Sequence, residues 1–213
     1  DGFRENGELS KQSLLINGNV FTSEKSNLTY LANFTKLKAF IPSSINYNDF
    51  MHNPTSADLS WSQSEGYESY DRGLFGLSYS QFLSPKLQNT TSAFVSFRTG
   101  YEPRPFDILE ENRISSGVRT KFALSTEIWK IKSDLSFGGE FYTEWFQTGN
   151  FINLYKNFPG QGSVQGDRIS ENKQERTYMN GFGQINFNIN SKLKVETGFN
   201  LNTTSYNLID LFN

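Results

Sequence analysis

The sequence lacks cysteine entirely and has a single histidine, His52, among its 213 residues. Without cysteine, disulfide frameworks, iron–sulfur clusters, thiolate zinc sites and cysteine nucleophiles are excluded. One histidine rules out His-rich metal sites and leaves little room for a Ser-His-Asp triad. No run approaches the roughly 18 consecutive apolar residues of a membrane-spanning helix, which excludes a helical membrane protein. We expect no metal site and no cofactor.

An excess of charge of either sign is also missing, because 20 Lys and Arg stand against 22 Asp and Glu, giving a net charge of −2. This balance gives no general attraction to nucleic acid, and we expect no nucleic-acid partner. Only 36% of the residues are apolar, yet 15% are aromatic. Disordered chains are poor in aromatic residues, so the composition indicates a folded protein with an unusually polar sequence.

What the sequence does contain is a regular alternation of apolar and polar residues. The clearest example runs from Leu193 to Thr203, where Val195, Phe199 and Leu201 fall on odd positions and polar residues on even ones. A period of two indicates a β-strand with one apolar and one polar face. Similar stretches recur in pairs joined by short polar turns, as in β-hairpins. These pairs predict eight strands, in hairpins over residues of about 11–40, 72–99, 113–146 and 174–207.

The segments between the hairpins are long and rich in Asn, Ser, Gly and Pro, at about 41–71, 100–112 and 147–173. Short turns on one side and long loops on the other are typical of an outer-membrane barrel, whose long loops are extracellular. A soluble β-sandwich is the alternative, but strands of about 12–15 residues exceed its usual length. We therefore predict an all-β fold, an antiparallel up-and-down meander of about eight long strands that forms an arc of a larger transmembrane β-barrel.

Charged residues in mid-strand follow the polar parity. A Lys or Arg that faces lipid at the membrane midplane costs about 2–4 kcal/mol, whereas a charge in a wet lumen costs little. We therefore predict that Arg119, Lys121, Glu140 and Glu196 point inward. The apolar parity should form the convex outer face in contact with outer-membrane lipid, and it includes Phe122, Leu124, Leu135, Phe137, Val195 and Phe199.

Two lysines, Lys36 and Lys38, break this segregation because they fall on the apolar parity. They follow Phe34 and approach a long loop, where the cost of a lipid-facing charge drops to about 0–1 kcal/mol. We interpret them as marking the rim of the membrane. If the short turns are periplasmic, both chain ends lie on the extracellular side, which predicts a piece from the middle of a larger barrel.

The stretch Gly-Tyr-Glu-Pro-Arg-Pro-Phe-Asp-Ile-Leu from Gly100 to Leu109, following Phe94 to Arg98, resembles the barrel of TonB-dependent outer-membrane receptors of the iron-complex or siderophore type, especially those of Bacteroidota. So does Gly-Tyr-Glu-Ser-Tyr-Asp-Arg from Gly66 to Arg72. The resemblance spans the chain as a strand–loop pattern. It implies a barrel of about 22 strands in the bacterial outer membrane. It also implies an N-terminal plug through which TonB energises uptake of a ferric chelate or similar nutrient, and neither plug nor TonB box lies in these residues.

No Gly-rich phosphate loop, nucleophile elbow or metal signature is present, so we predict a non-enzyme without catalytic residues. For ligand contact we expect rings and guanidinium groups at the loop bases to converge on an anionic complex. Packing of the loops against one another is the alternative role for each of these residues. Two functional classes stay open, namely transport of a ferric chelate or similar nutrient, and a structural or adhesive outer-membrane barrel without active transport. The candidate ligand residues are Tyr67, Tyr70, Arg72, Arg98, Tyr101 and Arg104.

Overall fold

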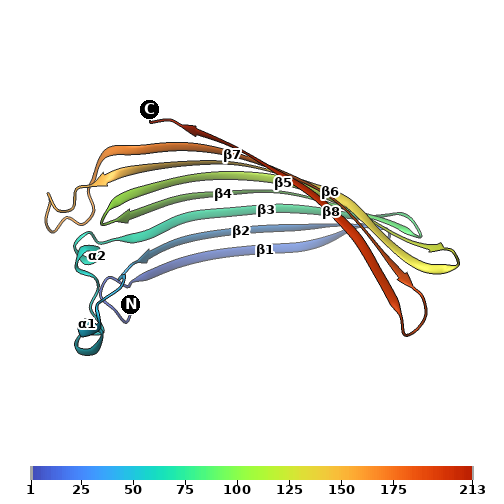
Figure 1. Ribbon diagram of the computed structural model, residues 1–213, viewed down its shortest axis with the longest axis horizontal. Coiled ribbons are helices and arrows are strands. Elements are labelled where there is room, and N and C mark those ends of the chain that lie inside the picture. Colours follow the sequence, from blue (N-terminus) through green and yellow to red (C-terminus); the bar gives the residue numbers. More distant parts are fainter. Residues whose placement is uncertain (1, 213) are drawn as a thin grey trace.

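The computed structural model describes residues 2–212 as one antiparallel sheet (Figure 1). Its eight strands lie in sequential order, each paired with its neighbours in the chain, so the connectivity is an up-and-down meander. This confirms the predicted fold class. The strands are β1 (Leu9–Ser23), β2 (Ser26–Phe40), β3 (Tyr67–Ser84), β4 (Leu87–Arg104), β5 (Asp107–Ile128), β6 (Ile131–Asn153), β7 (Gln165–Asn188) and β8 (Lys194–Asp210).

Short turns close one end of the sheet, at the right of Figure 1. Two residues each separate β1 from β2, β3 from β4 and β5 from β6. In the last of these turns Trp129 and Lys130 have φ angles of 50° and 66°. Two successive left-handed residues match the twist of the flanking strands, which is why such turns close tight hairpins. Pro85 occupies another turn, where its missing N–H breaks no strand pairing.

The longer connections lie at the opposite end, where β1 begins and β8 ends (Figure 1). Residues 41–66 join β2 to β3 and contain two short helices, α1 (Tyr47–His52) and α2 (Leu59–Gln63). The side chains of Asn46 and Asp58 cap the N-termini of these helices by accepting backbone N–H groups. Residues 154–164 join β6 to β7. We call this side of the sheet the loop end.

The strands extend further than the alternation predicted, and the loops are correspondingly shorter. The expected loop over residues 100–112 is wrong, because β4 and β5 pair as far as Arg104 and Asp107 and leave only Pro105 and Phe106 as a turn. The expected loops at 41–71 and 147–173 shrink to 41–66 and 154–164. Backbone pairing needs no apolar alternation, so a strand can continue through polar residues where its partner also continues.

Strand register divides the sheet into two chemically different faces. On one face Leu77 lies opposite Tyr30 and Ala93, and Ala93 lies opposite Val118, so apolar side chains form continuous rows across the strands. We call this the apolar face. The opposite parity forms the charged face, which carries Arg119, Lys121, Glu140 and Glu196 as predicted. All the residues predicted to face outward share the apolar parity, namely Phe122, Leu124, Leu135, Phe137, Val195 and Phe199.

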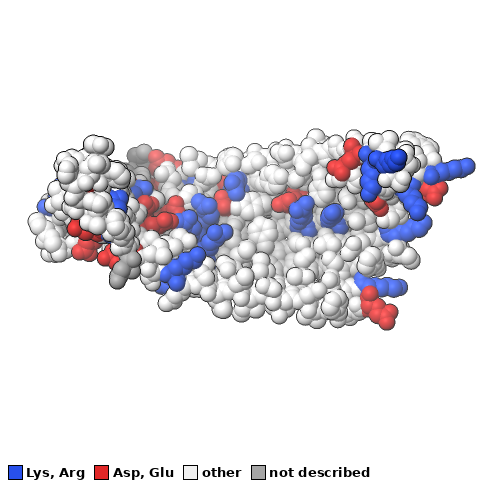
Figure 2. All heavy atoms as spheres, turned by 90° about the horizontal axis from the view of Figure 1, so that it is seen from below, with Lys and Arg blue, Asp and Glu red and all other residues white. Residues whose placement is uncertain are grey.

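The sheet is curved, and the charged face lies inside the curve. On the apolar face Val95, Phe97 and Ile114 are 41%, 45% and 49% exposed. Phe94 and Ser96 on the other face are half-buried. Side chains diverge on a convex surface and converge on a concave one, which accounts for this difference. Figure 2 views the sheet from below, within the curve, and shows charged side chains gathered along its middle.

Little of the sheet is fully buried. Among residues 2–212 the buried apolar side chains are Pro103, Ile108, Phe151 and Tyr155, which lie at the loop end. The apolar face instead remains open over its whole width, with rings such as Phe97 filling the space above Gly73 on the neighbouring strand. A contiguous exposed apolar surface of this extent marks contact with a membrane or another protein.

Candidate functional site

The charged face holds two clusters of ion pairs near the loop end. The first is centred on Glu144 of β6, whose side chain is only 9% exposed. Tyr142 donates its hydroxyl to Glu144 Oε2 at 2.5 Å. The guanidinium groups of Arg113 on β5 and Arg176 on β7 approach the same carboxylate, at 4.0 Å and 3.6 Å. Two guanidinium charges around one carboxylate leave this cluster with a net positive charge.

The second cluster is centred on Arg98 of β4. Its guanidinium contacts Glu68 Oε1 at 2.8 Å and Glu111 Oε2 at 3.8 Å. The same group lies over the ring of Tyr70, 4.7 Å from the ring centroid, which adds a cation–π contact. Arg98 is therefore held in place by two carboxylates and a ring, and its charge is compensated within the protein.

Arg72 of β3 lies directly opposite Arg98 on the charged face. Its side chain is exposed, and it forms no ion pair with any residue in the described range 2–212. Arg72 is thus the predicted ligand residue whose guanidinium is most available to an anion. Tyr70, two residues before it on the same strand, shares the charged face.

Two other predicted ligand residues, Tyr67 and Tyr101, lie on the opposite, apolar face. Their ring centroids are 6.1 Å apart, and Tyr67 also packs against Phe40 at 5.4 Å. Because strand parity separates them from Arg72 and Arg98, the six predicted residues do not converge on one point. The prediction of a ligand role for these two tyrosines stays a prediction.

Arg104, the sixth predicted residue, is engaged at the β4–β5 turn. Its Nε and Nη2 donate to the two carboxylate oxygens of Asp107 at 2.6 Å and 2.8 Å. Asn150 donates to the same carboxylate at 2.7 Å, and the Arg104 guanidinium lies over the ring of Phe106. Such two-pronged pairing is strong and directional. The geometry gives Arg104 a role in closing the hairpin.

The connections at the loop end are fastened to one another by side chains. Asn153 donates to the Arg104 carbonyl and to Ser163 Oγ, both at 2.8 Å, and Ser163 donates to the carbonyl of the buried Ser64 at 2.6 Å. At the start of the chain, Asn6 donates to the carbonyls of Ile41 and Gly66 at 2.8 Å and 3.0 Å. Side-chain hydrogen bonds therefore join the connections at the loop end to one another.

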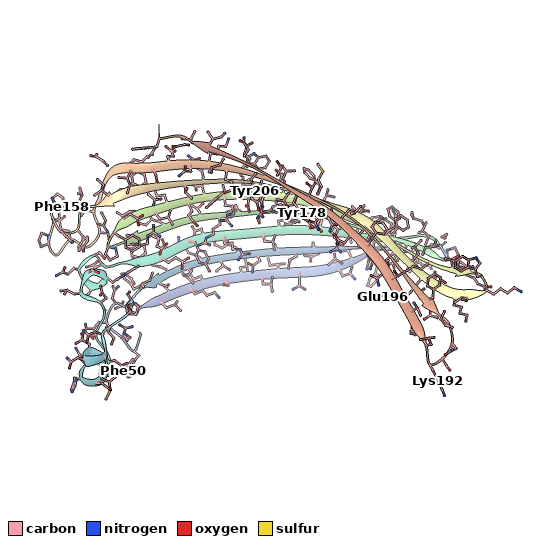
Figure 3. All side chains as sticks on the ribbon, in the orientation of Figure 1. Phe50, Phe158, Tyr178, Lys192, Glu196 and Tyr206 are labelled. Carbon is pink, nitrogen blue, oxygen red and sulfur yellow. The ribbon has the colours of Figure 1, made fainter. Side chains whose placement is uncertain are left out.

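Closer to the turns, the charged face forms a hollow of about 530 Å³ across β5 to β8. Arg119 and Lys121 line it and form no ion pair within the part of the chain that the structure describes. Glu196, labelled in Figure 3, lies on its β8 side. Asn180 Oδ1 is buried beside it without a hydrogen-bond partner among residues 2–212. Glu140 of β6 lies opposite Arg119, so carboxylates are near these cations without pairing with them in the described residues.

Sequence reasoning did not single out Arg113, Tyr142 and Arg176. These residues meet Glu144 only because β5, β6 and β7 pair in one particular register, in which Glu144 lies opposite Arg176. Glu144 falls on the polar parity of its strand, but the alternation gave no cross-strand partner. The register between separate hairpins was the missing information.

No group of His, Cys, Asp and Glu side chains within residues 2–212 is arranged to hold a metal ion. His52 is exposed in α1, and its Nδ1 lies 3.0 Å from the carbonyl oxygen of Asn48. In the same range, no helix is long and apolar enough to cross a membrane.

No protein-family model and no curated protein matches the sequence. Solved structures do match the fold. The ferric citrate transporter FecA in its unliganded form matches 98% of the chain with a TM-score of 0.84 and 12% identity. The closed form of the ferric-catecholate import receptor Fiu from E. coli K12 matches 99% with a TM-score of 0.75 and 8% identity. The ferric preacinetobactin receptor BauA from Acinetobacter baumannii matches 98% with a TM-score of 0.71 and 9% identity.

The chain spans about a third of the length of these structures, covering 31%, 36% and 36% of them. At such low identity the likeness concerns the fold. The described sheet therefore has the fold of a β-barrel segment of ferric-chelate receptors.

Proposed function

We propose that this chain is part of the barrel wall of an outer-membrane receptor that takes up a ferric chelate or similar nutrient, with energy supplied by TonB through a plug domain. The observation that carries the proposal is the match of almost the whole chain, a single eight-stranded meander, to the folds of FecA, Fiu and BauA. The structure neighbours are described as transporters and receptors, which supports a role in transport.

The two faces of the sheet support a membrane location. Along β5 the apolar face runs from Ile114 to Leu124, a length of about 33 Å at roughly 3.3 Å per residue. With a strand tilt of about 40° this length spans about 25 Å of membrane, which is the height of the apolar band in outer-membrane barrels. The exposed apolar side chains would then contact lipid, and the charged face would line the lumen.

For the ligand, we propose that Arg72 and Tyr70 make direct contact on the luminal face. Arg98, paired with Glu68 and Glu111, would hold the ring of Tyr70 in position. Ferric chelates are commonly anionic, and a guanidinium group forms strong charge-assisted hydrogen bonds to carboxylate or catecholate oxygens. Tyr67, Tyr101 and Arg104 would act indirectly, by holding the loop end in shape. The cations at the hollow, Arg119 and Lys121, would keep the path positive further along the wall.

Uptake by cells under iron limitation tests this function. Cells that carry the intact receptor gene and cells that lack it are supplied with a series of iron-59-labelled ferric chelates, with and without a functional TonB. The proposal predicts that at least one anionic chelate accumulates only when both the receptor and TonB are present. Equal accumulation of every chelate in both strains would overturn it and favour the structural or adhesive barrel.

A further inference from the structure

The apolar face carries two basic residues close together, Lys36 and Lys38 on β2. Both are exposed. Elsewhere in the described chain, Lys173 of β7 shares the apolar parity, but its ammonium lies 3.2 Å from Glu175. Two lysines on a largely apolar surface call for an explanation, because a lysine that faces lipid in mid-membrane costs free energy.

The position of the two lysines along β2 places them beyond the apolar band. Phe34 is the last apolar residue of this face on β2 before the two lysines, and Phe40 follows them at the end of the strand. Phe34 lies in the cross-strand row that also contains Phe97 and Ile114. At about 3.3 Å per residue and a tilt of about 40°, Lys36 lies about 5 Å and Lys38 about 10 Å past that row. Lipid headgroups occupy about 5–8 Å on either side of the hydrocarbon core. Lys36 therefore lies at headgroup depth, and Lys38 lies just beyond it, within reach of a flexible side chain.

Aromatic rings hold one of the lysines at this level. Lys38 Nζ lies 4.1 Å from the ring centroid of Tyr67 and 4.6 Å from that of Phe40. Tyr67 packs in turn against Tyr101. Tyrosine at the membrane–water boundary keeps its apolar body near lipid and its hydroxyl in water. The rings fix the lysine while leaving its ammonium open to solvent.

The immediate neighbours of the lysines are polar and largely uncharged. Lys36 lies opposite Gln12 on β1, and Lys38 lies opposite Ser10 on β1 and Ser69 on β3. The one carboxylate, Asp71, contacts Lys36 Nζ at 3.6 Å, and both side chains are well exposed. Two ammonium groups and one carboxylate leave a single net positive charge among hydroxyl and amide groups, which is a composition suited to a phosphate.

We propose that Lys36, Lys38 and the ring of Tyr67 form a binding site on the outer wall for the phosphate of an anionic membrane lipid. The site is separate from the luminal face, and it rests on the proposed membrane location of the chain. A bound lipid phosphate would sit between the two ammonium groups, with the Ser10 and Ser69 hydroxyls within the same polar surface.

Native mass spectrometry of the intact receptor in nanodiscs tests the site. The nanodiscs contain either phosphatidylcholine alone or a mixture with phosphatidylglycerol, and the lipid retained on the receptor is counted. We expect wild type to retain phosphatidylglycerol preferentially. The double variant Lys36→Gln/Lys38→Gln should lose about 25-fold of that preference, since each lysine at an anionic surface contributes roughly fivefold. The control Lys11→Gln/Lys121→Gln removes two charges from the other face and should retain the preference.

Equal retention by wild type and the Lys36/Lys38 variant, or an equal loss in the control, would overturn the site. Incorporation of all three proteins into nanodiscs as folded barrels is measured first by circular dichroism and heat-modifiable mobility on gels. If even the wild-type receptor formed no membrane barrel, the proposed function would fail together with the site. If it formed one and bound both lipids alike, only the site would fail.

Discussion

Arg72 of β3 and Arg98 of β4 lie directly opposite each other on the charged face, and only Arg98 has carboxylate partners. Like charges in facing strand positions destabilise a sheet. Glu68 and Glu111 offset the charge of Arg98, whereas Arg72 remains exposed. A residue that costs stability where it stands is a good candidate for a functional role, and this pair links the fold to the proposed ligand contact.

The Arg72–Arg98 pair predicts that stability and binding respond in opposite directions. Arg72→Gln should leave the unfolding free energy unchanged or raise it by up to about 1 kcal/mol, because it removes a like-charge contact. The same change should weaken binding of an anionic ferric chelate to the intact receptor. Thermal unfolding and equilibrium binding measure the two effects. A clear loss of stability with unchanged binding would assign Arg72 a structural role.

The Arg104–Asp107 pair predicts a loss of stability that does not depend on a bound ligand. Asp107→Asn breaks the two-pronged pairing with Arg104 at the β4–β5 turn. Hydrogen bonds to charged groups contribute about 1.5–3 kcal/mol, so we expect a loss of that order. Hydrogen exchange over residues 100–112 should accelerate. Glu127→Gln, an exposed change at the other end of β5, serves as the control and should leave exchange in this segment unaltered.

The alternation of the sequence was sufficient to predict eight strands, their order and the side chains on each face. It was not sufficient for the ends of the strands, since the stretch around Arg104 continues as strand through polar residues that have no alternation. The placement of Tyr67 and Tyr101 on the apolar face follows from counting alternate residues from Phe75 and Val95. It could therefore have been predicted from the sequence. In the cluster around Glu144, Arg113 belongs to the same predicted hairpin as Glu144. The approach of Arg176 could not be predicted, because the register between hairpins is set by the whole sheet.

The two faces predict opposite tolerance of arginine at neighbouring positions. Leu77 lies in the middle of the apolar face, and Ser78, the next residue, lies on the charged face between Thr29 and Ser92. Leu77→Arg should impair assembly of the intact receptor in the outer membrane, since the cost at mid-membrane is about 2–4 kcal/mol. Ser78→Arg should assemble normally. Heat-modifiable mobility of outer-membrane fractions distinguishes them, and similar behaviour of the two variants would contradict the assignment of the faces.

The cap of α2 predicts a local response to acid. The Ser60 hydroxyl, followed by the backbone N–H groups of Trp61 and Ser60, donates to Asp58 and holds its pKa below the usual value of 3.8 against the opposing effect of burial. Because the folded-state pKa is lowered, the cap stabilises the loop fully above about pH 4, and the stabilisation is lost as pH falls through the folded value. Fluorescence of Trp61 should report this transition below pH 4. In Asp58→Asn the acid transition should disappear, and an unchanged pH profile would show that the cap is not its cause.

Accumulation of an iron-59-labelled anionic ferric chelate by iron-starved cells tests the central claim most directly. Cells with the intact wild-type receptor are compared with cells that carry the Tyr70→Leu/Arg72→Gln variant. The two receptors are present at equal abundance in the outer membrane. The account predicts TonB-dependent accumulation in wild type and at least a tenfold lower rate in the variant at a limiting chelate concentration, since loss of a charged hydrogen bond contributes about that factor. Equal rates for every chelate that the wild type takes up would contradict a ligand-binding role for the charged face.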